Sequence, residues 1–215
     1  EVAPHKPVIF ADFVSNNGAY QFVDDHQKMI NIMTESLEDY NEVSQAQMKL
    51  VLFMDAAQHV SRISRIIRQP LGNALLLGLG GSGRQSLTRL AAHLSDYECF
   101  QIQLSKNYGV NEWREDIKMV MMQAGLQQKA TVFLFSDTQI KDESFLEDIN
   151  GILNSGDVPN IYAQDELDKI YNAMKSECAS LGLVPTKSNM FSVYTKRVKA
   201  NLHSVVCMSP IGDIF

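Results

Sequence analysis

Apolar residues recur three or four positions apart in two runs within the first third of the chain. The first run is Ile30, Met33, Leu37 and Tyr40, and the second is Phe53, Ala56, Val60, Ile63 and Ile67. This spacing places the apolar side chains on one face of an α-helix. Pro70 and Gly72 follow the second run and are residues that end helices. The pattern therefore predicts a pair of amphipathic helices near the start of the chain.

Beyond Gly72, short apolar runs alternate with segments of helical period. Strands are expected over 74–77, 99–104, 132–135 and 204–208, and helices over 87–94, 113–126, 143–154, 165–181 and 188–200. The run Ala74–Leu77 has no polar residue, which is typical of a parallel strand covered on both faces. Asp165 is the expected N-cap of its helix, and Gly182 ends that helix. The order predicts an α/β fold in which helices flank a doubly wound parallel sheet, preceded by the helical pair.

The first 19 residues differ in character from the rest. Pro4, Pro7 and Gly18 surround the short apolar run Val8–Phe10, so residues 1–19 are interpreted as a linker with one short extended segment. Residues 20–215 are interpreted as one large α/β unit. The chain starts at Glu1 rather than Met, and we expect it to be a piece of a longer protein.

Composition narrows the function classes. The net charge is -6 and no block of like charges occurs, which argues against a nucleic-acid partner. No apolar run approaches the roughly 20 residues that a membrane helix needs, so no membrane partner is expected. The three cysteines form neither a CxxC pair nor a zinc-ligand spacing. They indicate buried thiols in a reducing, cytoplasmic compartment.

A glycine-rich loop lies between the first buried strand and the helix that follows it. It reads Gly78-Leu79-Gly80-Gly81-Ser82-Gly83-Arg84-Gln85-Ser86. Its glycines permit positive φ angles, so that successive main-chain N–H groups point inward, and the following helix adds its N-terminal dipole. This is the strand–loop–helix context of a phosphate-binding loop. We expect the N–H groups of 80–84 to hold a nucleotide phosphate; the alternative is a turn that binds nothing.

Two positions depart from the usual phosphate-loop pattern. Arg84 stands where lysine is usual, and it is expected to neutralise phosphate charge, although its planar fork differs from a compact ammonium. Gln85 replaces the hydroxyl residue that binds Mg²⁺, and Ser86 comes one position too late.

The strand 132–135 ends in Ser136-Asp137-Thr138. Such strands in NTPases carry one carboxylate that holds Mg²⁺ through water and a second that activates the attacking water. In one register Ser136 takes the metal position and Asp137 the base position; in the other, Asp137 is the metal ligand and Thr138 the base. Either way only one carboxylate is present, and loss of a general base costs about 10²–10⁴ in rate. The alternative for Asp137 is a residue that caps the next turn.

Several motifs in a fixed order resemble a known family. They are LVLF at 50–53, HVSRI at 59–63, QPLG at 69–72, LLGLGGSGRQSL at 76–87, FLFSDTQ at 133–139, FLEDIN at 145–150, NLH at 201–203 and CMSP at 207–210. Together they resemble a dynein heavy chain, and most narrowly the fourth AAA+ module of an axonemal dynein. The resemblance runs from about Tyr20 to the C-terminus.

The resemblance implies an ATP-driven microtubule motor built on a ring of six AAA+ modules, located in the cytoskeleton of the ciliary axoneme. The fourth module of this family is regulatory and carries the stalk that reaches the microtubule. ATP or ADP with Mg²⁺ is the implied cofactor, and adjacent modules of the same heavy chain are the implied partners. Adenine contacts map to Phe22 and Val23, and the sensor position holds Ser209 instead of asparagine. Arginine fingers, a fifth strand and a helical lid would follow Phe215.

Three hypotheses follow. The first is a regulatory nucleotide-binding module with slow or absent hydrolysis. The second is a degenerate module with a purely structural role, either empty or permanently filled with ADP. The third, a free-standing P-loop kinase or transferase, would need an acceptor-binding lid with arginines after the third strand, and the sequence has none there.

Overall fold

The computed structural model describes residues 7–15 and 17–210 of the 215-residue chain. The chain begins with a small antiparallel pair, β1 (Phe10–Ala11) and β2 (Gln21–Phe22). Helices α1 (His26–Val43) and α2 (Met54–Arg68) follow, as the helical period predicts. Asp25 caps α1, because its Oδ1 accepts the Lys28 main-chain N–H at 2.9 Å.

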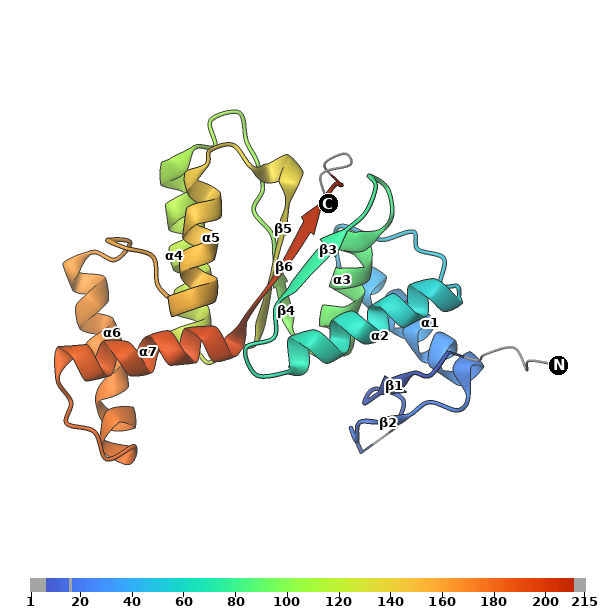
Figure 1. Ribbon diagram of the computed structural model, residues 1–215, viewed down its shortest axis with the longest axis horizontal. Coiled ribbons are helices and arrows are strands. Elements are labelled where there is room, and N and C mark those ends of the chain that lie inside the picture. The colour runs from blue at the N-terminus through green and yellow to red at the C-terminus, as the bar shows by residue number, and fades with distance from the viewer. Residues whose placement is uncertain (1–6, 16, 211–215) are drawn as a thin grey trace.

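A four-stranded parallel sheet forms the centre of the molecule (Figure 1). Its order is β3 (Ala74–Leu77), β6 (Leu202–Met208), β5 (Thr131–Ser136), β4 (Glu98–Phe100). The remaining elements are α3 (Arg84–Leu94), α4 (Val110–Leu126), the 3₁₀ turn η1 (Asp137–Gln139), α5 (Ser144–Ser155), α6 (Gln164–Ser180) and α7 (Lys187–Asn201). The expected parallel sheet with flanking helices, preceded by a helical pair, is confirmed.

The central strand β5 separates two hydrophobic cores. Val132 and Leu134 face the core made with α1, α2 and α3, whereas Phe133 and Phe135 face the core made with α4–α7. All four side chains are fully buried. Full burial of each is worth about 1.5–3 kcal/mol, so this alternation holds the sheet between its two helical layers.

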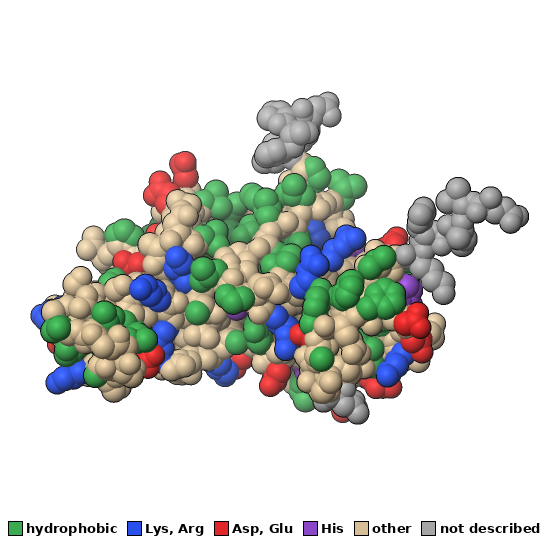
Figure 2. Space-filling view, turned by 60° about the horizontal axis from the view of Figure 1, so that its bottom comes forward, with side chains coloured by type: hydrophobic (Ala, Val, Ile, Leu, Met, Phe, Trp, Pro, Cys, Tyr) green, Lys and Arg blue, Asp and Glu red, His purple; other side chains and the backbone are tan. Residues whose placement is uncertain are grey.

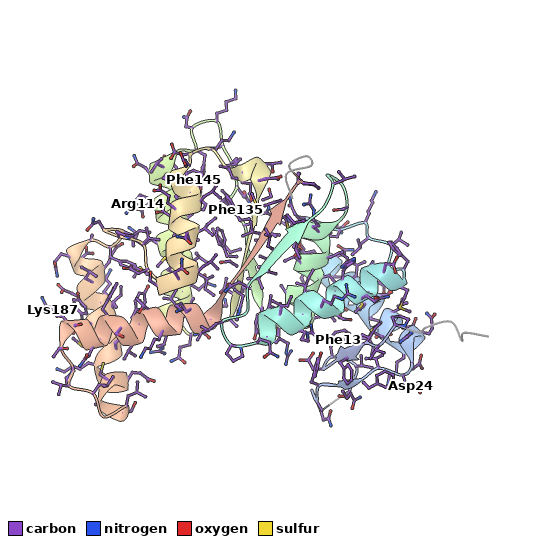
Figure 3. The ribbon with its side chains drawn as sticks, viewed as in Figure 1. Phe13, Asp24, Arg114, Phe135, Phe145 and Lys187 are labelled. Carbon is purple, nitrogen blue, oxygen red and sulfur yellow. The ribbon has the colours of Figure 1, made fainter. Side chains whose placement is uncertain are left out.

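An aromatic cluster fills the second core. Figure 3 shows Phe135 on β5 and Phe145 on α5 on the same side of the sheet. The Trp113 ring of α4 stacks on Phe145 at 4.3 Å between centroids, and its centroid is 5.4 Å from that of Phe135. The Trp113 indole N–H donates to Asp148 Oδ2 at 2.9 Å, so the only buried polar atom of this ring is satisfied.

On the face that Figure 2 shows, acidic and basic side chains are interspersed.

The structure corrects one expectation about strand β3. Ala74 and Leu76 pack against the first core, but Leu75 and Leu77 are 59% and 57% exposed. The strand was expected to be covered on both faces, and this was wrong for its outer face. The reason is its position at the edge of the sheet, where the core made with α4–α7 includes no residue of β3.

The start of α6 also differs from expectation. Asp165 was expected to be the N-cap, but it lies in the first turn and Ala163 occupies the cap position. The Ala163 N–H donates to Glu166 Oε2 at 2.8 Å, so a side chain from inside the helix closes this end. Gly182 does follow the helix with a φ of 69°, as a terminating glycine should.

The expected linker 1–19 is not separate from the following helices where it is described. Ile9 and Ala11 are buried in the same core as α1 and α2, and Asp12 Oδ2 lies 2.5 Å from Arg68 Nε. Residues 1–6 and 16 lie outside the described ranges.

Helices α4 and α7 approach closely at Gly125, and this contact yields a prediction. A Cβ at this position would lie 2.3 Å from Tyr194 Cε2 and 2.8 Å from Val198 Cγ2. Gly125→Ala would favour an isolated helix by about 0.5–1 kcal/mol, yet we expect a net loss of about 1–3 kcal/mol in unfolding free energy from overpacking. Urea denaturation measures the change. Met119→Ala, at an exposed position of α4, is the control and should change stability by less than about 0.5 kcal/mol. A stabilised Gly125→Ala protein would contradict the close approach.

Candidate nucleotide-binding site

The glycine-rich loop joins the end of β3 to the start of α3 at the carboxyl edge of the sheet (Figure 1). Gly81 and Gly83 have φ angles of 80° and 76°, in the left-handed region where a side chain is strained. Gly83 is the N-cap of α3, and its carbonyl accepts the Leu87 N–H at 2.8 Å. The two glycines therefore turn the chain so that the loop leads directly into the positive end of the helix.

A cavity of about 430 Å³ lies against this loop. Its lining joins residues 80–86 of the loop to residues from two other strand ends, Ser136, Asp137, Thr138, Cys207 and Ser209, together with Arg89 of α3. The structure thus brings together the loop, the expected metal and base residues Ser136 and Asp137, and the sensor-position residue Ser209. Gly78 and Leu79 belong to the same loop but do not line this cavity; Leu79 is largely exposed.

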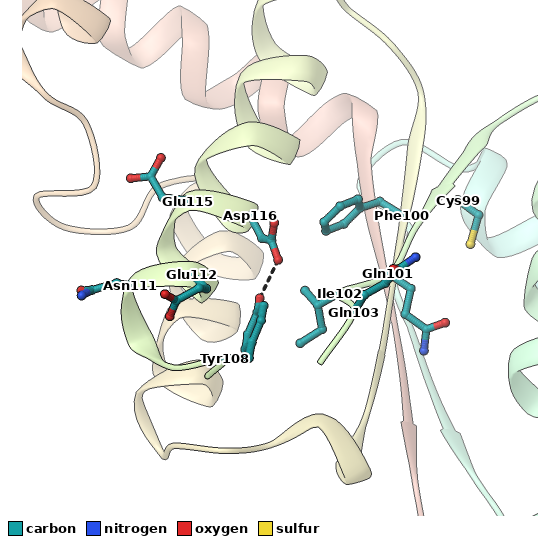
Figure 4. A pocket seen from close by; sticks show the side chains of 10 residues that line it. All are labelled: Cys99, Phe100, Gln101, Ile102, Gln103, Tyr108, Asn111, Glu112, Glu115 and Asp116. Atoms are coloured by element: carbon teal, nitrogen blue, oxygen red, sulfur yellow. Dashed lines mark hydrogen bonds between the residues drawn. The ribbon is translucent and has the colours of Figure 1, made fainter. Parts of the chain in front are cut away.

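A larger cavity of about 730 Å³ lies elsewhere, between the end of β4 and the start of α4 (Figure 4). Tyr108 donates to Asp116 Oδ2 across it at 2.6 Å, and burial together with this carboxylate raises the pKa of Tyr108. This cavity contains no part of the glycine loop. The smaller cavity is the candidate site because the glycine loop, Arg84 and Arg89 line it, which suits phosphate. The larger cavity also lies at a helix start, but among the described residues its lining has three carboxylates and no Lys or Arg.

Asp137 connects the ends of two neighbouring strands. Its Oδ2 accepts the Ser209 main-chain N–H at 2.7 Å, and its Oδ1 accepts the Thr138 N–H at 2.9 Å. The hydrogen bonds from Ser209 are the main cause that holds the pKa of Asp137 below its ordinary value; the Thr138 N–H and the Arg84 charge add to this effect, and partial burial opposes it. Asp137 is therefore a carboxylate at neutral pH.

Ser136 is almost fully buried. Its hydroxyl lies 2.7 Å from Thr138 Oγ1, and its main-chain N–H donates to Gln139 Oε1 at 3.0 Å. The polar atoms of this residue thus already have partners within the chain.

Arg84 points back at the main chain. Its guanidinium donates to the carbonyls of Leu76 and Leu79 at 3.3 and 3.2 Å and to the carbonyl of Met208. The side chain therefore ties the loop to the ends of β3 and β6 instead of projecting a free fork into the cavity. Its charge still acts on the site, because it lowers the pKa of Asp137. That Arg84 neutralises phosphate charge stays a prediction. Because its guanidinium is bonded to the main chain, we expect it to act through its charge rather than through a bidentate contact.

Sequence reasoning missed a chain of three carboxamides. Gln101 Nε2 donates to Gln85 Oε1 at 3.1 Å and to Gln139 Oε1 at 3.4 Å, and Arg89 donates to Gln101 Oε1. Gln139 Nε2 donates to the Ile102 carbonyl at 2.8 Å. One sequence signal was available: Arg89 follows Gln85 by four residues on one helix face, and Gln101 and Gln139 both come just after a strand.

Phe22 and Val23 were assigned to the adenine, but the structure does not bring them to the loop. Phe22 is half-exposed in the β1–β2 pair, where it packs against Phe10, and Val23 is buried in the first core. Figure 1 shows this pair at the lower right, whereas the loop between β3 and α3 is at the top. Leu50, just before α2, is closer: its Cδ1 lies 4.0 Å from where a Cβ of Gly83 would be.

A parallel sheet, a glycine loop that opens a helix, and a carboxylate at the end of another strand of the same sheet define a P-loop NTPase fold of the AAA+ type. The family model "P-loop containing dynein motor region D4" matches residues 48–215. This chain belongs to that family.

Relatives with curated descriptions are also dynein heavy chains. The chain is 56% identical over 218 residues to "Dynein axonemal heavy chain 1" of Mus musculus, a match that covers 100% of this chain and 5% of the relative. It is 45% identical to "Dynein axonemal heavy chain 6" of Homo sapiens over 98% of the chain, and 46% identical to "Dynein-1-beta heavy chain, flagellar inner arm I1 complex" of Chlamydomonas reinhardtii over 96%. In each case the chain spans 5% of the relative's length. Within residues 7–15 and 17–210, no helix has the length and apolar character to cross a membrane.

The low pKa of Asp137 predicts how its contribution depends on pH. A carboxylate with a lowered folded-state pKa adds stability that is fully present above its unfolded pKa of about 3.9 and disappears as pH falls through the folded value. Asp137→Asn should therefore be less stable than the unmodified chain at neutral pH, and the gap should narrow below about pH 4. Thermal unfolding across this range measures it. The same gap for Asp165→Asn, whose side chain is 75% exposed, should stay small throughout. If the stability difference between Asp137→Asn and the unmodified chain does not change with pH, the Asp137 carboxylate gains no stability from its hydrogen bond with the Ser209 N–H.

Proposed function

We propose that this chain is the large α/β part of the fourth AAA+ module of an axonemal dynein motor, and that it binds ADP or ATP in a regulatory role. The observation that carries the proposal is the loop cavity. In it, positive-φ glycines, the start of α3 and the strand ends of β5 and β6 surround a space of about 430 Å³, which is within the size range of small-ligand pockets.

The charges of the cavity favour an anion. Its ionisable lining that carries charge at neutral pH consists of Arg84, Arg89 and Asp137, two positive groups against one negative. The dipole of α3 adds positive potential at the loop. Phosphates of a nucleotide are the natural ligand of such a site, because main-chain N–H groups and helix N-termini bind phosphate without regard to the rest of the molecule.

Hydrolysis is expected to be slow or absent. Asp137 is the only carboxylate that lines the cavity among the described residues, and both of its oxygens accept main-chain N–H groups. A general base must accept a proton from water, and the low pKa of Asp137 makes it a weak base. Asp137 therefore acts as an electrostatic and structural group, with turnover reduced by the missing second carboxylate.

The relatives supply the setting of the proposal. The names of those described above place them in axonemes and flagella. We propose that this chain works with adjacent modules of its own heavy chain in the cytoskeleton of a cilium or flagellum, and that it meets the microtubule only through the stalk of the parent protein. Nucleotide occupancy would then bias the conformation of the ring rather than drive the stroke.

A structural spacer is the second candidate, and one observation favours it. Arg84 donates to three main-chain carbonyls, and these bonds hold the loop to the ends of β3 and β6 without a ligand. Gln85, Ser136 and Ser209 all depart from the residues of a hydrolytic site. A module of this kind would position its neighbours and bind no exchangeable nucleotide.

Titration with fluorescent ADP distinguishes the two candidates. Saturable binding to the unmodified chain is expected, with loss of at least tenfold in affinity, about 1.4 kcal/mol, in Gly83→Ala, because an alanine at positive φ distorts the loop at its helix entry. Gly182→Ala is the matched control: Gly182 has a φ of 69° and open space around its Cβ position, but lies at the end of α6. It should suffer similar backbone strain and bind ADP normally. Equal binding by both variants, or none by the folded unmodified chain, would refute the nucleotide site.

A further inference from the structure

An ordinary P-loop site uses Mg²⁺ to connect the loop to the neighbouring strand. The ion takes six oxygen ligands at 2.0–2.1 Å, among them the loop hydroxyl and, in many sites, a strand-end carboxylate through water. In this chain the corresponding positions are Gln85 on the loop side, and Ser136 and Asp137 on the strand side. Whether these residues fit the ion depends on which of their oxygens are available.

The loop-side oxygen is already used. Gln85 Oε1 accepts from Gln101 Nε2 at 3.1 Å, and the same Nε2 reaches Gln139 Oε1 at 3.4 Å. Gln139 Oε1 in turn accepts the main-chain N–H of Ser136 at 3.0 Å. Direct hydrogen bonds thus run from the first turn of α3 to the end of β5, which are the two elements that the ion would connect.

The strand-side oxygens are used as well. The Ser136 hydroxyl is paired with Thr138, and each carboxylate oxygen of Asp137 accepts a main-chain N–H. Direct ligation by the Gln85 amide oxygen or the Ser136 hydroxyl would compete with these bonds, and the ion sheds its water reluctantly. The residues present therefore fit the ion poorly, although Ser136 and Asp137 were expected to hold it.

Positive charge is already in place beside the carboxamides. Arg89 donates to Gln101 Oε1 and lines the loop cavity, as does Arg84 at the start of α3. Both guanidiniums lie near enough to Cys207, on the cavity wall, to affect its pKa, although burial is the larger effect and raises it. The two arginines would repel a divalent cation and only Asp137 would attract it. A phosphate would be attracted by both arginines and repelled by Asp137 alone.

We propose that nucleoside di- or triphosphates bind this site without a divalent cation. The carboxamide chain of Gln85, Gln101 and Gln139 makes the connection between α3 and β5, and Arg89 with Arg84 provides the charge that balances the phosphates. This proposal rests on the nucleotide binding proposed above and specifies its chemistry. It also gives a reason for weak hydrolysis, since the ion that would stabilise charge on the transferring phosphoryl group is not recruited.

The test is the affinity for fluorescent ADP in excess MgCl₂ and in excess EDTA at one ionic strength. The two dissociation constants should agree within about threefold, which is less than 1 kcal/mol. Gln85→Thr restores the hydroxyl of the usual pattern and removes one end of the carboxamide chain. In this variant Mg²⁺ should tighten binding by about tenfold or more. Gln164→Thr, in the first turn of α6 and remote from the loop, is the matched control and should behave as the unmodified chain.

The outcomes separate the two proposals. Binding by the unmodified chain only in MgCl₂, or at least tenfold tighter there, would overturn the cation-independent site and leave the nucleotide-binding function standing. Absence of saturable binding in both buffers by folded protein would overturn the function itself. Should Gln85→Thr fail to fold, the comparison of buffers on the unmodified chain decides the matter alone.

Discussion

The site exists because β6, the last strand among the described residues, inserts between β3 and β5. The parallel pairing aligns Cys207 with both Leu76 and Ser136, so that the residues just beyond Cys207 meet the glycine loop on one side and Asp137 on the other. The Met208 carbonyl accepts from Gly78 N–H at 3.2 Å and from Arg84, and the Ser209 N–H donates to Asp137. A shift of one residue in this register would reverse the faces of β6 and separate all of these partners.

The balance of charges and hydrogen bonds in the cavity explains how a P-loop can keep its shape while its catalytic set changes. Lysine in the usual position is a compact charge that reaches phosphate, whereas the fork of Arg84 satisfies three carbonyls at once. The loop gains internal order at the expense of a free cation. Asp137 shows the same tendency, because hydrogen bonds to the main chain make it a firm anchor and a poor base. Both features are consistent with the proposed nucleotide-binding role and with slow turnover.

Elements with a strong period were predictable from the sequence. Helices α1, α2, α4 and α7 follow the expected ranges within a few residues, because burial of one face decides them locally. Strand β5 does so because its short apolar run is buried on both faces. The glycine loop, Ser136 and Asp137 were also predicted to lie together, from the glycine pattern and from the end of a buried strand, whereas Ser209 was assigned through the family resemblance. The carboxamide chain was not, because Gln85, Gln101 and Gln139 are ordinary polar residues until three separate segments meet. The short hairpin that contains Phe22 was equally beyond reach, since its place depends on the packing of Ile9 and Ala11 against α1 and α2 rather than on any period.

Amide hydrogen exchange with and without ADP tests the central claim, a phosphate site at the glycine loop, most directly. The account predicts slower exchange on addition of ADP for the N–H groups of 80–84, with the distant β1–β2 pair unchanged, because bound phosphate would protect the loop donors from water. Unchanged exchange across the loop at saturating ADP, in protein that is otherwise folded, would contradict a nucleotide site there and leave the structural spacer as the better description.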